Sequence, residues 1–292
     1  MTNFNAIDLS LLKAPEVLEK LNFEQILAEI LADLKRRFPE FSAITEADPA
    51  YKILEAAAYR EVVIRQRVND AAKANMLAYA TGSNLDHLGA LFNIKRHVVI
   101  EATNESTATY EDDTALRQRI LLALEGITTA GSKESYIFHA LSACGKIADA
   151  SVYSPRPAEV AVTLLSRENN GIPSEETLSK VRARLGSEKV RPLTDKLTVQ
   201  AATIQSYNVA ATLKIKPGAA SSLIIAEAKK ELRAYAQRSF KLGATVALSG
   251  IYAALHQVAG VEKVTLATPK TNITTKVNAA PLLETVTINV ED

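Results

Sequence analysis

Hydrophobic residues recur at three- and four-residue steps through the first third of the chain, which is the spacing of an amphipathic helix. The first run predicts a helix over Glu16–Phe38, bounded on both sides by prolines. Asp48 and Pro49 predict a second helix start, because an Asp side chain accepts from a free backbone N–H and a first-turn Pro has no N–H to satisfy. No Gly or Pro follows until Gly82, so the pattern predicts a helix of about 30 residues, roughly 45 Å long.

This long helix carries two adjoining stripes of small and apolar residues. One stripe runs through Leu54, Ala57, Glu61, Ile64, Val68, Ala71, Asn75 and Ala78, and the other through Ala58, Val62, Arg65, Asn69, Ala72, Met76 and Tyr79. Two stripes predict a helix with two neighbours, as in a helical bundle, and alanines allow a close approach of backbones. The pattern does not distinguish a bundle within the chain from one between chains.

Polar residues interrupt these stripes, and they define the candidate interface. A solvated charged face is one interpretation, since Glu61 and Arg65 form a favourable i,i+4 pair. The alternative is that polar groups on a helix seam fix register and partner choice at some cost in stability. On the second interpretation, the interface residues are Leu54, Ala57, Arg60, Glu61, Ile64, Arg65, Val68, Asn69, Ala71 and Asn75.

The rest of the chain mixes helix and strand patterns. Residues 96–111 are polar and favour β structure, which makes them the best candidate for a domain boundary. Predicted helices follow Ser83-Asn84 (through Phe92), Asp112 or Asp113 (to about Glu125), Gly131-Ser132 (through Ala143), Ser174 (to Leu185), Ser222 (to Gln237) and Ser249 (to His256). Predicted strands are Ile147–Tyr153, Glu159–Leu165, Lys196–Gln200, Gln205–Ile215, Val261–Leu266 and an edge strand at Thr285–Val290.

These elements predict an α+β protein with an N-terminal long-helix bundle segment followed by small mixed α+β domains. The expected divisions are residues 1–95 as the helical segment, 96–170 as a first α+β domain, and 171–292 as a second with a C-terminal strand tail. A weak repeat relates the two α+β parts at an offset of 114 residues. It matches Ile137, Phe138, Ala140, Leu141, Ile147, Ala150, Val152 and Pro155 to Ile251, Tyr252, Ala254, Leu255, Val261, Val264, Leu266 and Pro269. Duplication of one helix–strand unit and coincidence of common elements both explain it.

Composition narrows the class of protein. Hydrophobic residues make up 47% and charged residues 23%, as in an ordinary globular chain, and the net charge of +1 argues against a nucleic-acid binder held by a basic field. Cys144 is the only cysteine, which excludes a disulfide framework. The sequence shows neither a secretory signal nor an apolar run long enough to span a bilayer, so we expect a soluble cytosolic chain.

Catalytic and metal-binding patterns are weak throughout. The four histidines form no H-E-x-x-H pair, and His139 lies five residues from Cys144, which does not align them on a helix face. We expect a buried structural thiol and a helix histidine whose hydrogen bonds are satisfied there. Glu111-Asp112-Asp113 is explained by helix capping and the helix dipole. No phosphate-binding loop or nucleophile elbow is present, so the sequence predicts no catalytic, cofactor or metal site.

Ordered motifs across most of the chain carry a family resemblance. In the first third they are Glu46-Ala-Asp-Pro, Lys52-Ile-Leu-Glu, Ala58-Tyr-Arg-Glu, Arg65-Gln-Arg-Val-Asn-Asp-Ala-Ala, Leu77-Ala-Tyr-Ala-Thr-Gly and Asn84-Leu-Asp-His-Leu. Later ones are Leu116-Arg-Gln-Arg-Ile, Ala148-Asp-Ala-Ser-Val, Ser154-Pro-Arg-Pro-Ala, Leu165-Ser-Arg-Glu-Asn-Asn-Gly, Val190-Arg-Pro-Leu-Thr-Asp and Ile251-Tyr-Ala-Ala-Leu-His. From about residue 15 to 270 the chain resembles the Baseplate J-like family of contractile phage tails.

The resemblance implies a structural protein without catalytic residues. Members form baseplate wedges that join around a central hub and spike into a ring, which widens when the tail is triggered. Two copies commonly associate with one smaller partner of the tail protein I type through a helical bundle, and a lysozyme-like wedge protein is a further neighbour. The resemblance thus implies homo-oligomeric copies in a ring, no nucleic acid and no membrane insertion.

It also implies assembly in the bacterial cytoplasm and residence in the baseplate of a phage or phage-tail-like particle. A wedge or adaptor of another contractile injection or secretion apparatus is the alternative.

Overall fold

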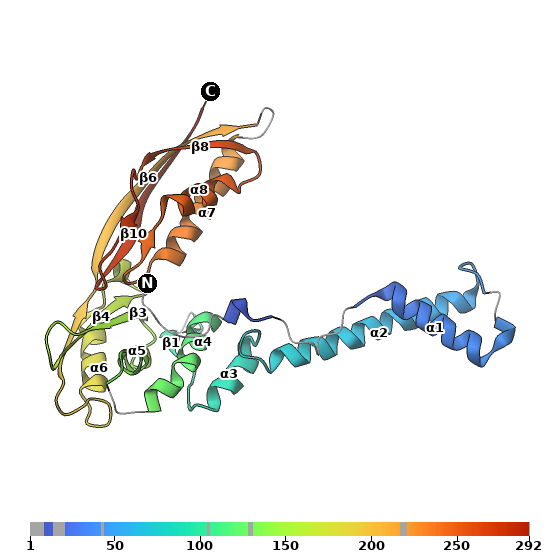
Figure 1. Cartoon of the computed structure of the whole chain (residues 1–292), viewed down its shortest axis with the longest axis horizontal. Helices are drawn as coiled ribbons and strands as arrows, with labels where there is room; N and C mark the ends of the chain where they lie inside the picture. Colours follow the sequence, from blue (N-terminus) through green and yellow to red (C-terminus); the bar gives the residue numbers. More distant parts are fainter. Residues whose placement is uncertain are drawn as a thin grey trace. The chain divides into compact units, whose positions relative to one another are not determined.

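The computed structural model describes residues 9–13, 21–41, 44–103, 106–127, 131–216 and 221–291. Contacts between residues divide it into two compact units, which meet along the chain between Lys95 and Arg96. The first, the helical unit, contains helices only, and the second, the α+β unit, contains helices and small sheets (Figure 1). The predicted α+β class is confirmed.

The helical unit contains the 3-10 helices η1 (Leu9–Leu11) and η2 (Pro39–Phe41) and the helices α1 (Phe23–Arg37), α2 (Pro49–Ala74) and α3 (Gly82–Ala90). Helix α1 begins later than the predicted Glu16, because the Asn22 side chain accepts from Gln25 N at 3.2 Å and caps the first turn. Most of the intervening residues, 14–20, lie outside the described part of the chain.

Helix α2 starts at Pro49 as predicted, but the expected capping hydrogen bond and the expected C-terminal end are not observed. Asp48 precedes the helix but does not cap it, because its Oδ2 accepts instead from Thr45 N at 2.6 Å and from Thr45 Oγ1 at 2.9 Å. At the other end the helix stops at Ala74, where Asn75 Nδ2 donates to Ala71 O at 2.8 Å. The predicted length of about 30 residues is therefore wrong, and α2 has 26. The predicted cap of α3 is also wrong: Thr81, two residues before Ser83, occupies the cap position, and the helix starts at Gly82.

The α+β unit begins with the antiparallel strands β1 (Val98–Ile100) and β2 (Thr109–Tyr110), helix α4 (Asp113–Leu121) and the 3-10 helix η3 (Ala123–Ile127). Asp112 caps α4 by accepting from Ala115 N at 2.9 Å, which confirms one of the two predicted caps.

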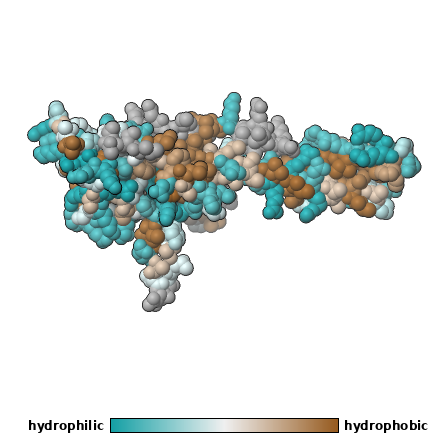
Figure 2. All heavy atoms as spheres, turned by 90° about the horizontal axis from the view of Figure 1, so that it is seen from below, coloured by the Kyte–Doolittle hydropathy of each residue, from teal (hydrophilic) through white to brown (hydrophobic). Residues whose placement is uncertain are grey.

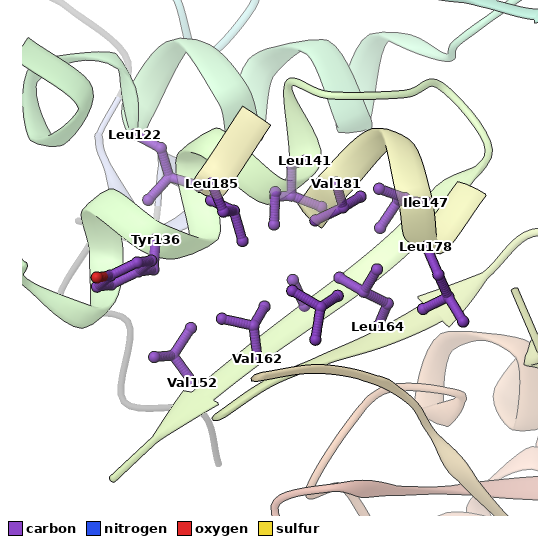
Figure 3. Close-up of a cluster of buried hydrophobic side chains, with 13 residues drawn as sticks. Leu122, Tyr136, Leu141, Ile147, Val152, Val162, Leu164, Leu178, Val181 and Leu185 are labelled. Carbon is purple, nitrogen blue, oxygen red and sulfur yellow. The ribbon is translucent and has the colours of Figure 1, made fainter. Parts of the chain in front are cut away.

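A first three-stranded sheet follows. Its elements are α5 (Lys133–Leu141), β3 (Ile147–Tyr153), β4 (Glu159–Ser166), η4 (Asn169–Gly171), α6 (Glu175–Leu185) and β5 (Lys196–Ala201). The strand order is β3-β4-β5, with β3 antiparallel and β5 parallel to β4. Helices α5 and α6 cover one face, and Figure 3 shows the leucines, valines and Tyr136 of both layers meeting in one core. We call residues 131–201 the first sheet domain.

In a second three-stranded sheet, as in the first, the central strand has one antiparallel and one parallel neighbour. The chain passes through the strands of the two sheets in different orders. The elements of the second sheet and its helices are β6 (Thr203–Ile215), α7 (Ser221–Ser239), β7 (Thr245–Val246), α8 (Leu248–His256), β8 (Val261–Thr268), β9 (Ile273–Thr274) and β10 (Ala279–Val290). The order is β10-β6-β8, with β8 antiparallel and β10 parallel to β6, so β10 is an edge strand as predicted. Helices α7 and α8 cover one face of this sheet (Figure 1), and Ala247 rather than Ser249 precedes α8. We call residues 203–291 the second sheet domain.

This topology bears on the division expected between residues 170 and 171. Strand β5 pairs with β4, and α6 shares the core of β3 and β4, so residues 175–201 belong with the first sheet. A boundary at 170 would cut through that core, and we place it at Ala202 instead.

The 114-residue repeat lies on α5–β3 and α8–β8, and in each pair the helix packs against the strand that follows it. Because the chain runs through the two sheets in different orders, the likeness is confined to this helix–strand pair.

Candidate protein interface

Helices α1 and α2 pack against each other through a small apolar core. Ile26 and Leu27 of α1 and Ala58 of α2 are buried, and Ala58 is 0% exposed. Leu54 and Val62 flank Ala58 and are partly buried in the same core. The absence of a larger side chain at Ala58 lets the two backbones approach closely. The core occupies the N-terminal half of α2.

The structure separates the two predicted stripes of α2. The stripe through Ala58 and Val62 faces α1, whereas most of the other stripe is exposed. Of the predicted interface residues, Ala57, Arg60, Ile64, Val68, Ala71 and Asn75 are exposed, Leu54, Glu61 and Arg65 are partly buried, and Asn69 is buried. Thus α1 covers the N-terminal part of one stripe, at Ala58 and Val62, and most of the other stripe is exposed on the helical unit.

The polar interruptions have different local roles. Arg65 Nε donates to Glu61 Oε1 at 3.0 Å, so this predicted i,i+4 pair is present. Asn75 donates to its own helix and acts as a C-cap. Asn69 is 6% exposed on a helix whose other residues, apart from Ala58, are not buried. Of the polar residues on the stripes, Glu61, Arg65 and Asn69 are therefore the ones with restricted access to solvent.

Large apolar side chains stand out on the exposed stripe. Ile64 is 59% exposed and Val68 is 58% exposed, although both are branched aliphatic residues on a regular helix. Figure 2 shows hydrophobic residues exposed among hydrophilic ones on the helical unit, at the right of the view. A surface of this kind marks a protein interface more often than a face that stays in water.

Further exposed side chains that were not among the predicted interface residues lie next to this surface. Ile53 is exposed and precedes Ala57 by one helical turn, so it extends the stripe toward the start of α2. Its i,i+4 spacing from Ala57 was the signal that could have found it. Tyr59 and Val63 are also exposed, one turn apart on a further face. At η2, Phe38 and Phe41 form an edge-to-face contact with ring centroids 6.4 Å apart.

The acidic run that the sequence assigned to capping has three separate roles. Asp112 caps α4, but Glu111 is buried in an ion pair with Arg119, and Asp113 Oδ1 accepts from Arg96 Nη2 at 2.7 Å. The capping interpretation is correct for Asp112 and wrong for Glu111.

His97 is partly buried and His139 is buried, whereas His256, also in the α+β unit, is exposed. The expectation that the hydrogen bonds of His139 are satisfied is wrong, because its Nδ1 has no partner in the described residues. Burial and the guanidinium of Arg119 lower the pKa of His97, and burial and Arg184 lower the pKa of His139. In the described residues His97 Nε2 and His139 Nδ1 have no hydrogen-bond partner. Cys144 is partly buried against the first core.

The described residues contain neither a metal-binding cluster nor a helix that could span a membrane. Within those residues, no three His, Cys, Asp or Glu side chains come together in a way that would hold a metal ion. Over the same part of the chain, every helix is too short or too polar to cross a membrane.

Family models match three successive parts of the chain. The Baseplate J-like N-terminal domain matches residues 46–103, the Baseplate J-like central domain residues 128–201, and the Baseplate J-like protein C-terminal domain residues 207–289. The last two matches correspond to the two sheet domains. The architecture is therefore that of a Baseplate J-like chain.

A known relative has the same class. Baseplate protein J of Escherichia phage P2 is 47% identical over 278 residues, which cover 91% of this chain and 92% of that protein. The chain belongs to the Baseplate J-like family. Among solved structures, a chain of the anti-feeding prophage baseplate aligns with 17% identity and a TM-score of 0.43, over 61% of this chain and 43% of that one.

Proposed function

We propose that this chain is a structural wedge protein of a contractile-tail baseplate. The observation that carries the proposal is the 47% identity to Baseplate protein J of phage P2 along nearly the full length of both chains. In addition, α2 carries an exposed apolar stripe that suits assembly.

The exposed stripe of α2 is the assembly surface in this proposal. It packs into a helical bundle with a second copy of the chain and with a smaller partner of the tail protein I type. Ile64 and Val68 supply apolar area, and complete burial of each contributes about 1.5–3 kcal/mol. Ala57, two turns before Ile64, and Ala71, one turn after Val68, lie on the same face and let partner helices approach closely. The partly buried Glu61–Arg65 pair lies at the border of the stripe and fixes the register.

The α+β unit forms the ring in the same proposal. Copies of it join around the central hub and spike next to a lysozyme-like wedge protein, and the ring rearranges when the tail is triggered. The chain is made and assembled in the bacterial cytoplasm and resides in the particle.

Co-expression with the tail protein I-type chain tests the bundle. The wild-type chain should co-purify with that partner as one complex, with its mass given by light scattering on size-exclusion chromatography. The variant Ile64→Asp/Val68→Asp should lose the complex, since two charges would be buried at the seam. Leu193→Asp replaces a 93% exposed leucine outside the helical unit and is the matched control. If the Ile64→Asp/Val68→Asp chain assembles like the control, the bundle assignment is wrong.

A further inference from the structure

One extended segment connects the two sheet domains. Strand β5 is an edge strand of the first sheet, and after the single residue Ala202 the chain continues as β6, the central strand of the second. Both backbone amides at this crossing are bonded: Ala202 N donates to Leu164 O at 2.9 Å, and Thr203 N donates to Asn278 O at 3.0 Å. The connection is thus hydrogen-bonded to both domains rather than a free linker.

Two side chains of β3 reach across the same junction. Asp149 Oδ2 accepts from Leu242 N, in the second sheet domain, at 3.0 Å, and Oδ1 accepts from the backbone N of Ala150 at 2.9 Å. Ser151 is 0% exposed, and its Oγ donates to Val277 O at 2.7 Å. The two contacts that cross the junction, Asp149 to Leu242 and Ser151 to Val277, each join residues more than ninety positions apart in the chain.

An apolar cluster seals the junction. Its buried members are Leu165, Ala202, Leu242 and Ala280, with Ile204 and Phe240 packed against them. Both domains contribute to it. Gly171, at φ +97°, lies against this cluster, and a Cβ there would come within 2.7 Å of Phe240. Leu242 belongs to the cluster through its side chain and to the Asp149 contact through its amide, so the polar and apolar contacts support each other.

We propose that Asp149 and Ser151 lock the two sheet domains into one rigid body. The carboxylate suits this role because each of its oxygens takes one amide, one from its own domain and one from the other. Burial raises the pKa of Asp149, and the two amides and nearby Lys241 act against that shift by favouring the charged form. The inference does not depend on which particle contains the chain.

Spin-label distances test the lock in the full-length chain. Nitroxide labels at Ser179→Cys on α6 and Ala226→Cys on α7, both exposed positions, place one probe in each domain. The native thiol is removed by Cys144→Ala. Double electron–electron resonance should give one narrow distance distribution for this chain. Asp149→Asn should broaden it, because Asn keeps only one acceptor oxygen and one amide loses its partner. Ser151→Ala should broaden it as well.

Ser154→Ala is the matched control, since Ser154 Oγ also donates to a carbonyl at 2.7 Å but within its own loop, to Arg156 O. That variant should keep the narrow distribution. Hydrogen exchange at the Leu242 amide gives a second readout, and it should rise by about tenfold or more in Asp149→Asn while the amides of central β4 stay protected. A broad distribution in the unmodified junction, an unchanged one in both lock variants, or equal loss of protection throughout β4 would overturn the proposal.

Discussion

Arg119 and Glu111 form an ion pair with side chains only 5% and 3% exposed, and Arg119 Nε lies 3.2 Å from Glu111 Oε2. Glu111 Oε1 also accepts from His97 N at 2.9 Å. The pair therefore joins α4 to the residue before β1, where the α+β unit begins. Because the pair is buried, removal of either charge should destabilise the fold: the charge that remains would be shielded from water.

Replacing Glu111 by Gln should lower the free energy of unfolding by about 3–5 kcal/mol, because the buried guanidinium of Arg119 would lose its ion pair with the Glu111 carboxylate. Urea unfolding followed by circular dichroism measures the loss. Glu175→Gln is the control, since Glu175 pairs with Arg182 at the surface and its side chain is 73% exposed. A Glu111→Gln chain as stable as the control would show that the buried pair is not needed.

Stability should fall as the pH drops below about 6.5. The folded-state pKa values of His97 and His139 are lowered, so between these values and about 6.5 the unfolded chain binds protons that the folded chain does not. The folded chain is therefore most stable above about pH 6.5, where both rings are neutral in the folded and unfolded states. It loses this stability as the pH falls from about 6.5 through the lowered folded-state pKa values. Urea midpoints at about pH 7.5 and about pH 5.5 measure the effect. The difference should shrink in His97→Gln/His139→Gln but not in His87→Gln, which replaces an exposed ring. If the urea midpoint changes equally between the two pH values in the wild type, in His97→Gln/His139→Gln and in His87→Gln, the account is contradicted.

Gly171→Ala should destabilise the α+β unit by about 2–4 kcal/mol, because a methyl group would meet three side chains at 2.7–2.9 Å and the backbone is at φ +97°. Gly243→Ala separates the two causes. Its φ is +68°, but the nearest atom to a new Cβ is 3.6 Å away, so it should cost only about 1 kcal/mol. Thermal unfolding compares the stability of the two variants. An equal loss of stability in both would show that the side chains around Gly171 shift to make room for the added methyl group.

Leu54 and Ile64 should behave differently although both were predicted interface residues. Leu54 packs against α1, so Leu54→Asp should lower helicity and melt the helical unit in the isolated chain. Ile64 is exposed, so Ile64→Asp should leave the circular dichroism spectrum and thermal unfolding of the isolated chain unchanged. Loss of helicity in Ile64→Asp would mean that the residue supports the fold of its own chain.

Local signals predicted much of the α+β part. Ser132 and Ser174 each accept from the third amide of the following helix, and the predicted ends of α6 and β3 match the structure. These elements are bounded by caps, glycines and prolines that act within a few residues, so they can be found from sequence alone.

Contacts between distant elements were not predictable in this way. Nothing near Glu111 indicates that Arg119 will meet it in a buried pair, and nothing near Asp149 indicates an amide from Leu242. The domain boundary expected at residue 170 differs from the one that we place at Ala202 for the same reason. Strand β5 pairs with β4, but it follows β4 in the chain only after a helical crossover, and no local signal reveals that pairing. At the interface, periodicity found both stripes of α2, but only the packing of α1 shows which of them stays exposed.

Electron cryo-microscopy of the assembled particle tests the central claim most directly. The account predicts that residues 49–74 form one helix of a bundle that contains helices of other chains. Ile64 and Val68 should be buried in it. A map in which this stretch of α2 is surrounded by solvent, or in which Ile64 and Val68 contact no other chain, would contradict the account.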